Sequence, residues 1–230
     1  MFTAYETLKA IAKIYSALFA RPQVHGCFPL PGGPKIIAAN HTLASDALQI
    51  PLVIEEKLLF LAQANLFTLP IVGRMLGQSG QIPVEQGDNK GCIALKHACR
   101  ALRDGKTLVI FPEGRLVPPA ERIPARSGVI RMALQTGAPI IPLGIYVPLE
   151  NITGLSIHRL GKKRTGLWQT SGRCHLTFGA PWNPRADRHK EEHLQTLTNE
   201  LMNKIYTLVA ETKRERACVL PILLKPTHQL

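Results

Sequence analysis

His41 and Asp46 are the residues of this sequence whose types and spacing best suit acid–base chemistry. They stand in residues 36–46 (IIAANHTLASD), where an apolar stretch leads directly into Asn40 and a helical pattern follows. In a parallel α/β sheet, the loops that follow the strands line the ligand crevice. A carboxylate across a tight turn can hold a histidine in one tautomer, which leaves the other ring nitrogen free to act as a general base. The same pattern also fits a plain turn in which Asn40 and Asp46 cap the chain and His41 has no role.

A second candidate segment is formed by residues 107–115 (TLVIFPEGR), where an apolar stretch again ends in a polar loop. Arg115 can bind a phosphate group through two parallel hydrogen bonds. Gly114 lets the backbone approach a ligand closely. Glu113 can accept a hydrogen bond from a substrate hydroxyl, or it can hold Arg115 in place. The alternative is a surface loop that binds nothing.

The third segment, residues 138–145 (APIIPLGI), is apolar and contains prolines and a glycine. Pro142 and Gly144 disfavour regular ladder pairing, so we expect this strand at a sheet edge or a bulge. An apolar wall of this kind would suit an acyl chain. An ordinary structural strand is the alternative interpretation.

Taken together and in this order, these segments resemble the sequence blocks of the glycerolipid acyltransferase family, which includes the 1-acyl-glycerol-3-phosphate acyltransferases. The family's first block, NHxxxxD, is matched by Asn40, His41 and Asp46. Its third block, FPEG, is matched by residues 111–114, and its apolar fourth block is similar to residues 138–143. The combination of HxxxxD and FPEG in one chain, each after an apolar stretch, is a specific signal.

The family's second block, an apolar stretch that begins with glycine and ends with arginine, is similar to residues 80–86 (GQIPVEQ). Here Gln86 stands where the family usually has the arginine that helps to bind the acceptor phosphate. Arg115 follows FPEG directly, where a threonine is usual, and this variant resembles the lysophospholipid-acylating branch. The missing positive charge could come from one of three other residues: Arg74, Arg122 or Arg126.

The resemblance implies a role for each matched residue. His41 and Asp46 would form the catalytic pair, and the substrate-binding residues would be Glu113, Gly114, Arg115 and Gln86. The acyl donor would be acyl-CoA or acyl carrier protein, with no metal and no separate cofactor.

The composition limits the choice of partners. The 230 residues carry 28 Lys+Arg and 16 Asp+Glu, a formal net charge of +12. Such a surplus attracts nucleic acid, an anionic membrane surface or phosphorylated substrates. The charge alone does not choose among these partners, although the sequence has neither zinc-finger spacing nor an aromatic RNA-binding motif. The resemblance to the acyltransferases implies a lipid substrate and a membrane surface, and no nucleic acid. Five cysteines without a CxxC pair indicate a reducing compartment and no metal site.

The alternation of strand and helix patterns predicts an α/β fold, with a mostly parallel mixed sheet flanked by helices. We expect a single acyltransferase domain over residues 1–230, with a catalytic core over 26–181 and a C-terminal helix and tail over 185–230. Residues 1–20 have apolar side chains at helical spacing, so this amphipathic helix either covers the core or lies in a lipid interface. No apolar run is long enough to span a bilayer, so we expect a peripheral protein on the cytoplasmic side of the membrane. Strands are predicted over 35–39, 58–63, 81–84, 107–111, 140–147 and 175–178, and helices over 45–54, 66–76, 89–102, 127–135 and 187–211.

The function that follows is transfer of a fatty acyl group to the hydroxyl of a lysophosphatidate-like acceptor in phospholipid biosynthesis. Two alternatives use the same pair: a lysophospholipid acyltransferase with a different head group, and a thioester hydrolase that activates water. A family member that binds lipid without turnover is a third. A basic nucleic-acid-binding protein would leave both HxxxxD and FPEG unexplained.

Overall fold

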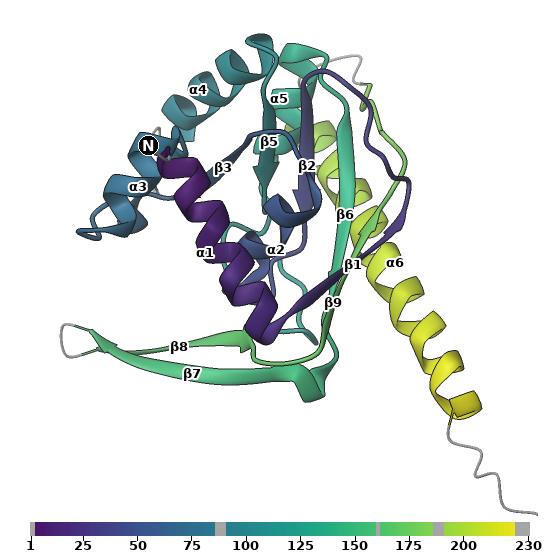
Figure 1. Ribbon diagram of the computed structural model, residues 1–230. Helices are drawn as coiled ribbons and strands as arrows, with labels where there is room; N and C mark the ends of the chain where they lie inside the picture. Colours follow the sequence, from purple (N-terminus) through teal and green to yellow (C-terminus); the bar gives the residue numbers. More distant parts are fainter. Residues whose placement is uncertain (1–2, 86–90, 160–161, 186–190, 224–230) are drawn as a thin grey trace, which may run out of the picture.

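The computed structural model describes residues 3–85, 91–159, 162–185 and 191–223, and a single large sheet organises them (Figure 1). The seven strands of this sheet follow the order β1-β9-β6-β2-β5-β3-β4. Strands β6, β2, β5, β3 and β4 run parallel to one another, whereas β9 is antiparallel to β6 and β1 is parallel to β9. The strands are β1 (Arg21–Gly26), β2 (Lys35–Ala39), β3 (Leu58–Gln63), β4 (Ile82–Val84), β5 (Thr107–Ile110), β6 (Ile140–Tyr146) and β9 (Arg173–Phe178). The predicted mostly parallel mixed sheet is confirmed.

Helices cover both faces of this sheet. They are α1 (Ala4–Phe19), α2 (Asp46–Val53), α3 (Val72–Ser79), α4 (Gly91–Arg103), α5 (Gly128–Thr136) and α6 (Glu191–Leu223). Alternate side chains of a strand point to opposite faces, and β2 shows this clearly. Ile36 and Ala38 belong to the apolar cluster that α4, α5 and α6 complete, whereas Ile37 and Ala39 belong to the cluster that includes α2. Figure 1 shows α1 and α2 on the near side of the sheet and α6 behind it.

The N-terminal helix α1 has a well-formed start and a divided surface. The hydroxyl of Thr3 accepts the Glu6 N–H (3.2 Å), and the Glu6 carboxylate accepts the Thr3 N–H (2.7 Å), which together make a capping box. The helix packs against α2 and α3 and buries Ala12 and Ser16. Its large apolar side chains that stay exposed are Ile11, Ile14, Leu18 and Phe19. In the part of the chain that the structure describes, no helix has the length and apolar character needed to cross a membrane.

Two elements do not appear among the predictions. One is β1, whose sequence RPQVHG lacks an apolar alternation because it lies at the sheet edge with most residues exposed. The other is a separate hairpin of β7 (Ile152–Arg159) and β8 (Lys162–Gln169), which reaches out below α1 in Figure 1. Each strand of the hairpin pairs only with the other, so neither needs the buried apolar run that identifies the central strands.

Of the two positions predicted for β6, the sheet edge is wrong, whereas a bulge beside Pro142 agrees with the pairing. This strand lies between β9 and β2, and Pro142 stands opposite Ala38 in the parallel ladder. Pairing with β9 begins only at Leu143, and the Pro142 carbonyl accepts a hydrogen bond from the N–H of Gly179 (2.8 Å) just beyond β9. Before the proline, Ile140 already pairs with Trp182, and the register shifts by one residue between that bridge and the ladder that begins at Leu143. The missing proline N–H therefore falls at this irregularity in the antiparallel pairing, so an interior strand tolerates it.

The helix predicted over residues 66–76 is shifted. A short 3₁₀ turn, η1 (Ala64–Leu66), comes first, and α3 begins only at Val72. Pro70 explains the delay, because proline disfavours helical backbone at the residue before it. Gly73 then lets α3 lie against the preceding turn, since a Cβ at this position would lie 2.0 Å from the Phe67 carbonyl oxygen.

Candidate active site

The two loops with candidate catalytic residues lie side by side at one edge of the sheet. β2 leads into Asn40 and His41, and β5 leads into residues 111–114. Because β2 and β5 are parallel neighbours, their carboxyl ends lie at the same edge. The loops are also joined directly, since the Glu113 carboxylate accepts a hydrogen bond from the His41 N–H. The two segments singled out in the sequence therefore form one site.

The imidazole of His41 contacts the carboxylate of Asp46. His41 Nδ1 and Asp46 Oδ2 are 3.2 Å apart, and the same oxygen accepts the backbone N–H groups of Thr42 and Leu43 at 2.8 Å. Asp46 is the first residue of α2, where the helix dipole favours a negative charge. Its side chain is 2% exposed, whereas that of His41 is 19% exposed. A proton on Nδ1 directed at Asp46 leaves Nε2 as the free nitrogen of a partly exposed ring.

The second loop holds His41 from three directions. The Phe111 ring stacks on the imidazole, with 3.9 Å between ring centroids and 14° between planes. The His41 N–H donates to Glu113 Oε2 (2.6 Å), and the His41 carbonyl accepts the N–H of Val117 (2.8 Å). Both backbone groups and one ring face of this histidine are therefore fixed by residues that follow β5.

Glu113 is buried, with 5% of its surface exposed. Its Oε2 accepts the His41 N–H and its Oε1 accepts the hydroxyl of Tyr206 (2.7 Å), a residue of α6. Burial raises the pKa of Glu113, and the hydrogen bonds from Tyr206 and His41 oppose that rise. The Glu113 carboxylate thus accepts hydrogen bonds from His41 and Tyr206. The role of Glu113 in acceptor binding stays a prediction.

Asn40 and Gly144 have structural tasks that the sequence did not reveal. The Asn40 amide donates to the carbonyl of Ile145 (3.0 Å) and accepts its N–H (2.8 Å), which ties the end of β2 to β6. A Cβ on Gly144 would lie 2.8 Å from Cβ of Leu208, so this glycine lets α6 pack against β6. The whole run from Ile140 to Ile145 is buried, which favours the interpretation as a structural strand over an exposed acyl wall.

The arginines considered for phosphate binding lie in two different parts of the fold. Arg115, Arg122 and Arg126 are all exposed and come from the chain that follows FPEG. The Arg126 side chain lies along Gly114 (φ +69°), where a Cβ would lie 3.3 Å from Arg126 Nε. The remaining candidate, Arg74, is exposed on α3. Gln86 lies outside the described residues.

Residues that sequence reasoning missed are Phe111 as a ring partner, Val117 and Tyr206. No signal in the sequence identifies Tyr206, because it is one apolar-face residue of a long helix and its partner is 93 positions away. Among the residues that the structure describes, no group of three or more His, Cys, Asp or Glu side chains is arranged to hold a metal ion.

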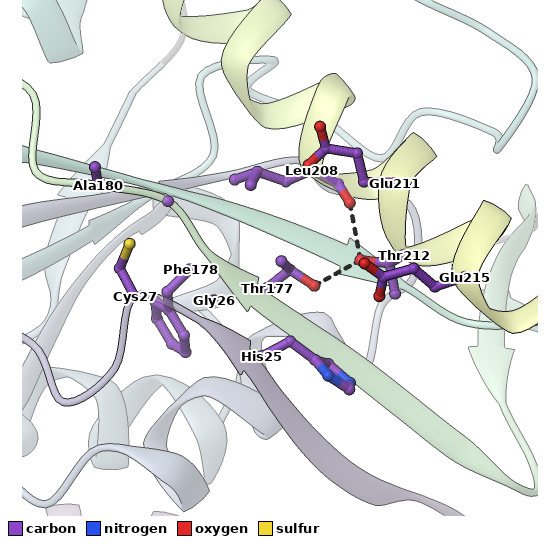
Figure 2. Close-up of a pocket in the computed structure, with 11 residues that line it drawn as sticks. His25, Gly26, Cys27, Thr177, Phe178, Ala180, Leu208, Glu211, Thr212 and Glu215 are labelled. Atoms are coloured by element: carbon purple, nitrogen blue, oxygen red, sulfur yellow. Dashed lines mark hydrogen bonds between the residues drawn. The ribbon is translucent and has the colours of Figure 1, made fainter.

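A hollow of about 460 Å³ lies elsewhere, between β1, β9 and α6 (Figure 2). Its lining includes His25, Cys27, Glu211 and Glu215, and the Thr177 and Thr212 hydroxyls form a hydrogen bond (2.6 Å) beside it. None of the lining residues belongs to the two candidate loops. The hollow is therefore separate from the site built on His41.

Comparison with known sequences places the chain among its relatives. A 1-acyl-sn-glycerol-3-phosphate acyltransferase of Borreliella burgdorferi is 31% identical over 131 residues, which cover 54% of this chain and 52% of that protein. A chloroplastic 1-acyl-sn-glycerol-3-phosphate acyltransferase of Brassica napus is 24% identical over 140 residues, which cover 58% of this chain and 40% of that protein. The matched part of the chain thus spans only about half or less of these relatives.

Comparison of structures gives the same fold. The crystal structure of the 1-acyl-sn-glycerophosphate acyltransferase PlsC from Thermotoga maritima superimposes with a TM-score of 0.65. The two chains are 22% identical, and the match covers 91% of this chain and 79% of the other. The model of the acyltransferase family matches residues 21–146, a range that includes both candidate loops. The chain belongs to the acyltransferase family.

Proposed function

We propose that this protein transfers a fatty acyl group from acyl-CoA or acyl carrier protein to the hydroxyl of a lysophosphatidate-like glycerophosphate. The observation that carries the proposal is the contact between His41 Nδ1 and Asp46 Oδ2, beside the FPEG loop. The acceptor class follows the names of the Borreliella and Brassica relatives. The pathway would be phospholipid biosynthesis.

In the proposed reaction, Nε2 of His41 removes the proton from the acceptor hydroxyl as its oxygen attacks the thioester carbonyl carbon. The carbon–sulfur bond then breaks, and the departing thiolate takes the proton from the imidazolium, which returns His41 to its neutral form. Asp46 keeps the ring in the required tautomer and stabilises the imidazolium. A thioester is already activated, so this route needs no covalent acyl-enzyme.

The acceptor phosphate is assigned to the exposed guanidinium groups that follow FPEG. Arg115 comes directly after Gly114, and Arg126 lies along the same glycine. Guanidinium groups bind phosphate oxygens in pairs, which gives orientation as well as attraction. Glu113 and the backbone of Gly114 would shape the same subsite, and Gln86 stands at the position of the family's second-block arginine.

The lipid substrates call for contact with a membrane surface, and α1 has a suitable face. Ile11, Ile14 and Leu18 are 47%, 62% and 68% exposed and follow helical spacing. On neighbouring α3, Val72 is exposed as well, and so is Ile71 just before it. We place these side chains in the lipid interface, helped by the net charge of +12.

We place the protein on the cytoplasmic leaflet of that membrane. The support comes from the sequence: its five cysteines are an odd number, widely spaced and without a CxxC pair, a usage that suits a reducing compartment.

A donor-by-acceptor assay tests the proposed reaction. The purified protein would be offered acyl-CoA or acyl carrier protein with lysophosphatidate, glycerol-3-phosphate, other lysophospholipids or no acceptor. We expect thiol release that depends on an acceptor and an acylated product that mass spectrometry detects, with lysophosphatidate as the preferred acceptor. Release of free fatty acid at the same rate with and without an acceptor would instead indicate a hydrolase.

A further inference from the structure

We propose that Tyr206 of α6 is a positioning residue for the general base: through Glu113, its hydroxyl fixes the backbone of His41. The inference rests on the proposed function for its catalytic consequence. The contact chain has two hydrogen bonds, from Tyr206 to Glu113 Oε1 (2.7 Å) and from the His41 N–H to Glu113 Oε2 (2.6 Å).

The Glu113 carboxylate needs both donors. A buried charge is costly unless it is paired or hydrogen-bonded, and this side chain is almost completely buried. The groups that face it are His41 from the first loop, Asp46 from α2 and Tyr206 from α6. Burial raises its pKa, the two hydrogen bonds lower it, the charge of His41 lowers it and that of Asp46 raises it. Removal of the Tyr206 donor should therefore raise the pKa of Glu113 further.

Tyr206 is suited to be a constant donor. Burial and the neighbouring Glu113 raise its pKa well above the usual value for tyrosine, so the phenol keeps its proton at any physiological pH. The guanidinium carbon of Arg122 lies 4.5 Å from the Tyr206 ring centroid, a cation–π contact that helps to hold the ring. The helix itself is firmly seated, since Leu201 and Ile205 are completely buried.

The charge on Glu113 also matters during the reaction. When His41 takes up a proton, the imidazolium is attracted by the carboxylates of Asp46 and Glu113. The same attraction between His41 and Glu113 lowers the pKa of Glu113. A carboxylate that holds the backbone of the base and faces its developing charge would favour the transition state. The hydrogen bond from Tyr206 lowers the pKa of this carboxyl group, which favours its ionised form, and it holds the side chain in place.

The test is Tyr206→Phe, which removes only the hydroxyl. We expect kcat to fall about tenfold, as for the loss of one hydrogen bond to a charged group, while the acceptor KM stays unchanged. In a Glu113→Gln background the same substitution should have no further effect. The matched control is Tyr5→Phe, which removes a tyrosine hydroxyl on α1, away from the two loops. The Tyr5 hydroxyl donates to the backbone carbonyl of Glu56 and accepts the N–H of Leu58. An unchanged kcat in Tyr206→Phe, or an equal fall in Tyr5→Phe, would overturn the proposal.

A second measurement does not depend on turnover. The backbone amide proton of His41 is bonded to the Glu113 carboxylate, so its NMR shift should follow the titration of that group. In Tyr206→Phe the midpoint of this titration should move upward by about one pH unit. If the titration midpoint is the same in Tyr206→Phe and in the wild type, the link from Tyr206 to His41 through Glu113 is refuted, whatever the activity of the variant. If the upward shift occurs but the wild-type protein transfers no acyl group, the positioning link stands and the proposed function fails.

Discussion

The loop after β2 and the exposed side chains proposed to bind phosphate and lipid differ in how firmly the protein holds them. In the loop, Asp46 accepts three hydrogen bonds with one oxygen, and the backbone N–H and carbonyl of His41 both have partners. The exposed binding groups, by contrast, have large parts of their side chains open to solvent. We define these groups as Arg115, Arg122 and Arg126 together with the α1 residues Ile11, Ile14 and Leu18.

This difference separates two tasks. A general base works best when its geometry is set before the substrate arrives, because no free energy is then needed to reorganise it during the reaction. Phosphate and lipid binding tolerate side chains that adjust, since attraction to a charge or a surface does not need one fixed geometry. Changes in the loop should therefore act on kcat, and changes in the exposed binding groups should act on KM or on membrane partitioning.

His41→Ala tests the loop and should have the largest effect. General-base catalysis is worth about 10²–10⁴-fold, so we expect kcat to fall by at least the lower figure. The alanine keeps the backbone bonds to Glu113 and Val117, so the fold should persist, and circular dichroism with thermal melting would check this. His97→Ala, on the exposed side of α4, is the matched control and should leave turnover intact. Turnover near that of the wild type in His41→Ala would remove the residue from its assigned role.

The sequence was sufficient to predict the elements beneath this loop. The range 35–39 coincides with β2, whose five residues are all buried, because interior parallel strands are covered on both faces and appear as continuous apolar runs. The range 58–63 coincides with β3, another apolar run. The spacing of HxxxxD also predicted the contact between His41 and Asp46, since both residues lie within a single tight turn.

Contacts between distant parts of the chain could not be predicted in this way. The link from Tyr206 to Glu113 joins residues 93 positions apart, and neither the helical pattern of α6 nor the FPEG loop specifies the other. The edge strand β1 was missed for a related reason. Its side chains are mostly exposed, so its sequence carries no apolar period.

The exposed face of α1 provides the next test. Ile14→Ser combined with Leu18→Ser should weaken binding to anionic vesicles about 10- to 100-fold, because each side chain gives up a good part of the roughly 1.5–3 kcal/mol that burial of a large apolar group contributes. Vesicle flotation would measure this, and kcat with a short-chain, monomeric acceptor should not change.

Ile93→Ser is the control for this surface, since Ile93 is 63% exposed on α4, much as Ile14 is 62% exposed on α1. It should float with vesicles like the wild type. Equal losses in the α1 and α4 variants would mean that general surface hydrophobicity, rather than a face built on α1, governs the binding.

The smallest expected effect belongs to Arg115→Ala. An exposed cation contributes less than a buried one, because solvent screens it, so we expect the acceptor KM to rise about three- to tenfold while kcat stays nearly constant. Steady-state kinetics over a range of acceptor concentrations would measure kcat and KM separately. A higher salt concentration should reduce the difference in KM between Arg115→Ala and the wild type. Arg100→Ala removes an exposed charge from α4, away from the two loops, and should leave the acceptor KM unchanged. If both arginine variants raised KM alike, the acceptor would be responding to net charge alone. If neither did, Arg115 would not be a phosphate ligand, and among the arginines of the exposed binding groups only Arg122 and Arg126 would remain as candidates for that role.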